Sequence, residues 1–99
     1  MAATPVKVRW TSLAVGHLKC THEYVAAESP ISADKVIQRI LTAVTVLEEH
    51  PSLGRSGRVE GTRELIIAGT PFIVPYRIRR DQVEVLAVLH SARRSPETF

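Results

Sequence analysis

The segment VLHSARRSP, residues 88–96, places a histidine and two arginines directly after an apolar run. The His90 imidazole can take or give a proton near neutral pH, because its unperturbed pKa is about 6.5. Arg93 and Arg94 carry planar guanidinium groups that suit phosphate or carboxylate. This spacing predicts either acid–base chemistry on an anionic substrate or a binding site for an anionic partner. The structural alternatives are an imidazole that caps the end of a sheet and two solvated arginines.

The net positive charge of the chain comes from its second half. Residues 1–54 carry five basic and five acidic side chains, which cancel. The basic residues that follow are all arginines: Arg55, Arg58, Arg63, Arg77, Arg79, Arg80, Arg93 and Arg94. This distribution favours a nucleic acid or an acidic peptide as partner, and an ordinary solvated basic surface is the alternative.

Length and composition predict one soluble domain that spans residues 1–99. The chain has 44% hydrophobic and 23% charged residues, and no apolar run approaches the roughly 18–20 residues that cross a bilayer. The start, MAATPVKVRW, lacks the apolar core of a signal peptide, so we expect a cytoplasmic protein with no membrane partner. Cys20 is the single cysteine, and the histidines show no metal-binding spacing, so we expect neither a disulfide, a metal nor a cofactor.

The hydrophobic pattern predicts an α+β fold in the order β-α-α-β-β-β. Val6, Val8 and Trp10 alternate with basic residues as in a strand, and a first helix is expected from Leu13 to about Ala27. Ser32 is the expected cap of a second helix, whose apolar residues follow the helical period: Ala33, Val36, Ile37, Ile40, Leu41, Val44 and Leu47. Three strand-like segments follow at 62–68, 71–79 and 82–90. The expected fold is a helical hairpin on one side of a small antiparallel sheet.

A two-residue turn at Arg80-Asp81 would pair the last two strands so that partner residue numbers sum to 161. This register places four residues of the first strand on one apolar face: Phe72, Val74, Tyr76 and Ile78. It sets Arg77 opposite Glu84, as in a cross-strand ion pair, and His90 opposite Pro71. Pro75 has no N–H to give to the ladder, so it predicts a bulge or a locally unpaired strand.

Two longer motifs carry a family resemblance. They are P-x-L-G-R-x-G-R-V-x-G-T-R-E-L, within residues 51–65, and V-L-x-V-L-H-x-A-R-R-x-P, within residues 85–96. Both follow a strand that ends in Trp10 and the helical segment EYVAAESPISADKVIQRI. In this order the chain resembles the RelE/ParE superfamily, the toxic halves of bacterial type II toxin–antitoxin modules, over nearly its whole length.

The resemblance implies two activities on one fold. RelE-like members are ribosome-dependent mRNA endoribonucleases, for which His90, Arg63 and Arg93 are the candidate catalytic residues here. Arg77 is a further candidate to stabilise the phosphorane, and the alternative for Arg63 is to anchor the connector through backbone carbonyls. ParE-like members bind DNA gyrase and stall it on cleaved DNA, without enzymatic activity of their own. The set of side chains that the resemblance implies for a RelE-like enzyme is incomplete. The tail SPETF has no tyrosine, the strand segment TPFIVPY has no arginine, and no lysine follows Arg39. The ParE-like interpretation is therefore preferred.

The resemblance also implies a cognate antitoxin, a small acidic protein that forms a hetero-oligomer with the toxin. The candidate contacts for this antitoxin or for the target are Arg55, Arg58, Arg77, Arg93 and Arg94. Such modules inhibit growth and stabilise plasmids. The sequence leaves open whether gyrase or the ribosome with its mRNA is the target, and hence whether the protein is an enzyme.

Overall fold

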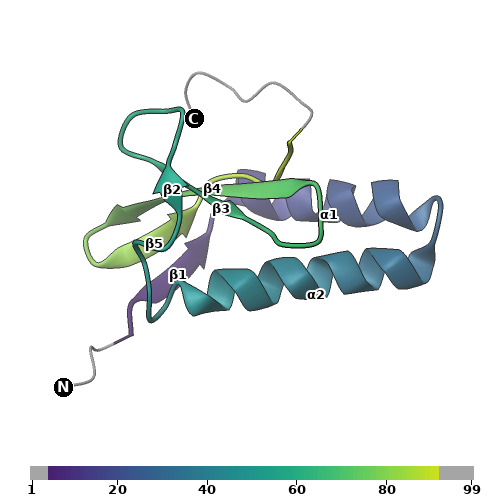
Figure 1. Ribbon diagram of the computed structural model, residues 1–99, viewed down its shortest axis with the longest axis horizontal. Helices are drawn as coiled ribbons and strands as arrows, with labels where there is room; N and C mark the ends of the chain where they lie inside the picture. Colours follow the sequence, from purple (N-terminus) through teal and green to yellow (C-terminus); the bar gives the residue numbers. More distant parts are fainter. Residues whose placement is uncertain (1–4, 92–99) are drawn as a thin grey trace.

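Two helices cover one face of a six-stranded sheet in the computed structural model, which describes residues 5–91 (Figure 1). The elements are β1 (Lys7–Trp10), α1 (Ser12–Ala26), α2 (Pro30–Val46), β2 (Arg55–Ser56), β3 (Arg63–Ile66), β4 (Phe72–Arg79), β5 (Gln82–Val85) and β6 (Leu89–His90). The predicted α+β fold and helical hairpin are confirmed. Among residues 5–91, no helix is both long and apolar enough to span a membrane.

A side-chain hydroxyl caps the start of each helix. Thr11 caps α1, and its hydroxyl accepts a hydrogen bond from the N–H of Ala14 at 3.2 Å. α2 is capped by Ser29, whose hydroxyl accepts from the N–H of Ser32. The expected cap at Ser32 is therefore wrong. Pro30 explains the earlier start, because its fixed φ and missing N–H suit the first helical position.

The core lies between the helices and the covered face of the sheet. α2 contributes Ala33, Ile40, Val44 and Leu47 from its predicted stripe, all buried. The α2 stripe is narrower than predicted, since Leu41 is exposed. In α1, Leu13 is exposed as well. Ile78 was expected on the buried face but is 43% exposed, because the β4–β5 hairpin projects past the end of α2 (Figure 1).

The sheet is mixed, with strand order β1-β5-β4-β3-β2 and β6 paired to β4. β1 pairs with β5 in parallel, Lys7 with Gln82 through Trp10 with Val85, whereas all the other pairings are antiparallel. The prediction of an antiparallel sheet therefore holds for every strand except β1. A parallel pair requires a long crossover between its strands, and the helical hairpin begins that connection.

The β4–β5 register confirms the predicted hairpin and then slips by one residue. Arg79 pairs with Gln82 and Tyr76 with Val85, while Arg80 and Asp81 adopt the left-handed backbone of a tight hairpin turn. The carbonyl of Pro75 then accepts a hydrogen bond from the N–H of Leu86 at 2.9 Å, but Pro75 has no N–H with which to donate one.

Residues 86–88 leave the ladder after this point, which confirms the irregularity predicted at Pro75. The ladder resumes with His90 opposite Phe72. The prediction that His90 faces Pro71 is therefore wrong by one residue, and the slip moves its side chain to the other face of the sheet.

Ile40→Ala tests the packing of α2. Ile40 is fully buried, so removing its side-chain atoms should lower the free energy of unfolding by about 2–5 kcal/mol, measured by urea denaturation. Ile31→Ala makes the same chemical change at a side chain that is 71% exposed, and should stay within about 0.5 kcal/mol of the parent. Equal losses in the two variants would contradict the assigned core face.

Candidate functional site

The uncovered face of the sheet carries an ion-pair network centred on Glu84. Arg9 of β1 and Arg77 of β4 both donate to its carboxylate, Arg77 through Nε at 2.7 Å. Glu84 is 6% exposed and lies between the two arginines because β5 is the strand between β1 and β4. Hydrogen bonds from Arg9 and then Arg77 hold the pKa of this carboxyl below its usual range, against the opposing effect of burial. The predicted Arg77–Glu84 pair is confirmed, and Arg9 is an additional partner that the sequence did not reveal.

Arg63 is the first residue of β3 and contacts the connector, the segment that leads from α2 into β2. Its Nη1 donates to the backbone carbonyls of Ser52 at 3.2 Å and Gly54 at 2.8 Å. This is the anchoring arrangement expected as the alternative to a catalytic role. It holds the segment that leads from α2 into β2 against the sheet.

Tyr76 binds the same connector through its side-chain hydroxyl. Its hydroxyl accepts from the N–H of Gly54 at 2.8 Å and donates to the carbonyl of Pro51 at 2.7 Å. Burial raises the pKa of Tyr76, while the Gly54 hydrogen bond and the charge of Arg63 oppose that shift. A side chain at Gly54 would put its Cβ 2.7 Å from the tyrosine ring, so only glycine fits this contact. The P-x-L-G-R motif is thus a docking element for the connector.

Arg55 and Arg58 lie beside Glu64 at the opposite edge of the sheet from β1. Arg55 donates to the Glu64 carboxylate from Nε and Nη2, and the Arg58 backbone N–H donates to its other oxygen. Glu64 shares the uncovered face with Arg77, since it pairs with Pro75 two residues along β4. Three of the predicted binding arginines therefore sit on or beside one face, two of them paired with carboxylates. Arg93 and Arg94 lie outside the described residues.

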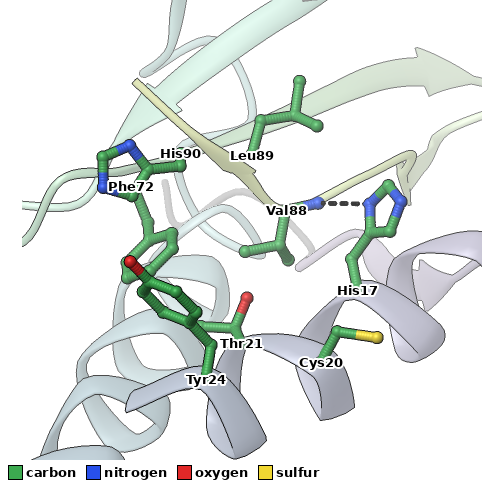
Figure 2. A pocket seen from close by; sticks show the side chains of 8 residues that line it. All are labelled: His17, Cys20, Thr21, Tyr24, Phe72, Val88, Leu89 and His90. Atoms are coloured by element: carbon green, nitrogen blue, oxygen red, sulfur yellow. Dashed lines mark hydrogen bonds between the residues drawn. The ribbon is translucent and has the colours of Figure 1, made fainter. Parts of the chain in front are cut away.

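His90 lies on the face that α1 covers, because it pairs with Phe72 of the core. Its ring meets the Phe72 ring edge-on, with centroids 5.5 Å apart. It lines a pocket of about 450 Å³ between α1 and β6 (Figure 2). The other lining residues are His17, Cys20, Thr21, Tyr24, Phe72, Val88 and Leu89.

The pocket borders a stretch of sheet edge that β1 does not reach. β1 ends at Trp10, and beyond it Nδ1 of His17 accepts the backbone N–H of Val88 at 3.2 Å (Figure 2). Tyr24 is 66% exposed at the pocket mouth. The sequence contained one signal for this site: His17, Cys20 and Tyr24 form a flank of the first helix, beside its buried residue Thr21.

The candidate catalytic residues thus do not share one site within residues 5–91. His90 faces the pocket beside α1, whereas Arg77 lies on the uncovered face of the sheet. The Arg63 guanidinium donates to backbone carbonyls of the connector. Arg93 is outside the described residues, so its position relative to His90 stays a prediction.

Comparisons with known proteins find matches along most of the chain. A family model described as the ParE toxin of the type II toxin–antitoxin system parDE matches residues 8–95. The putative toxin Y4kP of Sinorhizobium fredii is 44% identical over 93 residues, which cover 94% of this chain and 96% of that protein. Toxin RelE2 of Caulobacter vibrioides is 30% identical over 87 residues, covering 88% and 97%.

Two solved structures share the fold. A chain of the chromosomal ParDE toxin–antitoxin system from P. aeruginosa superimposes with a TM-score of 0.79 and 26% identity, covering 89% of this chain and 98% of that one. A chain of the toxin–antitoxin complex RelBE2 from Mycobacterium tuberculosis gives a TM-score of 0.63 and 25% identity, covering 87% and 98%.

Glu84→Gln tests the ion-pair network through its pH dependence. The lowered pKa means that the carboxylate stabilises the fold above its ordinary value of 4.5, and that this stabilisation is lost as pH falls through the lowered value. We expect the variant to unfold at lower urea concentration than the parent at about pH 7, and the difference to shrink as the pH falls below 4.5. A difference that is constant over this range would contradict the network's role.

Proposed function

Because the chain belongs to the ParE toxin family of type II toxin–antitoxin systems, within the RelE/ParE superfamily, we propose that it arrests growth by poisoning DNA gyrase. On this proposal a cognate antitoxin neutralises the toxin in the cytoplasm, and the toxin stalls gyrase on cleaved DNA through binding alone. The protein would then be an inhibitor and not an enzyme.

The observation that carries this choice is the separation of the groups that RNA cleavage needs. Attack of a 2′-hydroxyl on the adjacent phosphate needs a proton acceptor, a proton donor and cations around one phosphorus atom. Within residues 5–91, His90 lies beside α1 while Arg77 is held by Glu84 on the other face of the sheet. Arg63 is engaged with the connector. This arrangement supports a binding protein over a nuclease.

An antitoxin partner is proposed on two grounds. Both structural relatives come from toxin–antitoxin systems by their descriptions. The pocket beside α1 also presents an exposed aromatic side chain, Tyr24, next to a stretch of sheet edge. An amphipathic segment would bury apolar side chains there. The candidate contacts Arg55, Arg58 and Arg77 lie on or beside the uncovered face of the sheet. Contact of the antitoxin with these arginines, and with Arg93 and Arg94, stays a prediction.

The alternative is a RelE-like ribosome-dependent mRNA endoribonuclease. It is favoured by the relative from Caulobacter vibrioides, which is called RelE2 and is 30% identical to this chain. Under this alternative His90, Arg63 and Arg93 are the candidate catalytic residues.

Growth is the first test of the toxin function. Expression of the chain alone should arrest growth, and co-expression of a small acidic protein encoded next to it should restore growth. The measurement is the colony count after induction, with soluble protein verified. Normal growth with folded protein present would contradict the toxin function.

The target is tested with one preparation in two assays. We expect the protein to inhibit supercoiling by purified gyrase and to stabilise cleaved DNA, and to leave mRNA intact on programmed ribosomes. Cleavage of mRNA with gyrase unaffected would overturn the proposed target in favour of the alternative. Inactivity in both assays would exclude both targets.

His90→Gln separates the two mechanisms by the size of its effect. For a gyrase inhibitor the change should weaken inhibition only by lost contacts, about 1 kcal/mol or roughly fivefold. For a nuclease that moves a proton through His90, mRNA cleavage should fall by about 10²–10⁴-fold. The midpoint of urea denaturation, measured in parallel, is the control for folding.

A further inference from the structure

A cluster of five basic side chains lies on the sheet where β1, β5 and β4 run side by side. We call it the basic face; it consists of Lys7, Arg9, Arg77, Arg79 and Arg80. Lys7, Arg9, Arg79 and Arg80 are exposed, and Arg77 is half-buried. The helices pack on the opposite side of the sheet.

The strand register arranges the Cα atoms of four of these residues at the corners of a rectangle. One row across the sheet is Lys7, Gln82 and Arg79, and the next is Arg9, Glu84 and Arg77. Strands lie about 4.8 Å apart and alternate residues about 7 Å apart, so the rectangle measures roughly 10 by 7 Å. Next to it is a hollow of about 430 Å³ lined by Arg9, Arg79, Arg80, Gln82 and Glu84.

The whole formal excess of positive charge belongs to this cluster. Its five basic residues are opposed locally by Asp81 and Glu84, and the remaining eight basic and eight acidic residues of the chain cancel. Glu84 is buried and shared by Arg9 and Arg77, so it orients two guanidinium groups. A guanidinium has five N–H donors, and each arginine spends one on Glu84, which leaves donors for a further anion.

We propose that the basic face binds the phosphate backbone of duplex DNA. Arginine forks bind phosphate through paired N–H groups, and an excess of cations on an uncovered sheet suits a regularly charged polyanion. Every residue that lines the hollow is polar or charged, whereas an antitoxin-like segment also needs apolar surface. Tyr24 and Ile31 of the helical hairpin present such apolar surface and lie outside the basic face.

This inference deepens the proposed function and rests on it for its biological meaning. Gyrase holds duplex DNA, so a toxin bound to gyrase could contact that DNA through the basic face. DNA binding itself is measured without gyrase. A failed DNA-binding test would leave the gyrase proposal standing, and a failed gyrase assay would leave DNA binding standing.

The experiment measures binding of the full chain to a fluorescent duplex by anisotropy at several salt concentrations. The parent should bind with a slope of log K against log salt of about −3 to −4, since each phosphate contact contributes about −0.9. Lys7→Gln with Arg79→Gln removes two cations from one row of the rectangle. That double variant should bind at least about tenfold more weakly at low salt and lose about 1.8 from the magnitude of the slope.

The matched control is Lys19→Gln with Lys35→Gln, which removes the same charge from exposed positions on α1 and α2. It should keep the slope of the parent. Absent binding by the parent, or equal losses in the two double variants, would overturn the proposal. Tighter binding of an oligoglutamate of equal charge, with the same dependence on Lys7 and Arg79, would also overturn it and assign the face to an acidic protein.

Discussion

Pro75 has no backbone N–H, and the half of the sheet that carries the pocket depends on this missing donor. Pro75 accepts one bond from Leu86 and returns none, so residues 86–88 leave the ladder and β6 resumes one residue out of step. The slip turns His90 onto the Phe72 side of the sheet. It also leaves the N–H of Val88 to His17, a side chain of α1. The pocket exists because the hairpin is interrupted here.

The two faces of the sheet therefore carry different kinds of side chain. The covered face holds the apolar core, the connector clamp of Tyr76 and Arg63, and at its end the pocket with its two histidines. The uncovered face holds Glu84 between two arginines and the surrounding cations. His90 and the Glu84 ion-pair network thus lie on opposite sides of one layer.

The sequence predicted the local parts of this structure well and the non-local parts poorly. The Arg80-Asp81 turn and the Arg77–Glu84 pair depend on spacing within a short segment, and both are confirmed. The α2 stripe is confirmed at its buried positions, and the family, which rests on motifs along nearly the whole chain, is confirmed too. The parallel pairing of β1, the second partner of Glu84 and the pocket depend on segments far apart in the chain. The slip at His90 was missed because periodicity continues through a bulge, although Pro75 marked its place.

The parallel pairing of β1 with β5 also decides when the molecule acquires its charged face. Arg9 and Glu84 are 75 residues apart in the chain, and the intervening residues include both helices and the β3–β4 pair. Closing so large a loop is slow compared with forming a helical hairpin. During translation, Arg9 of β1 has no Glu84 to pair with until the ribosome has released β5. A nascent chain therefore lacks the assembled charged face until β5 pairs with β1.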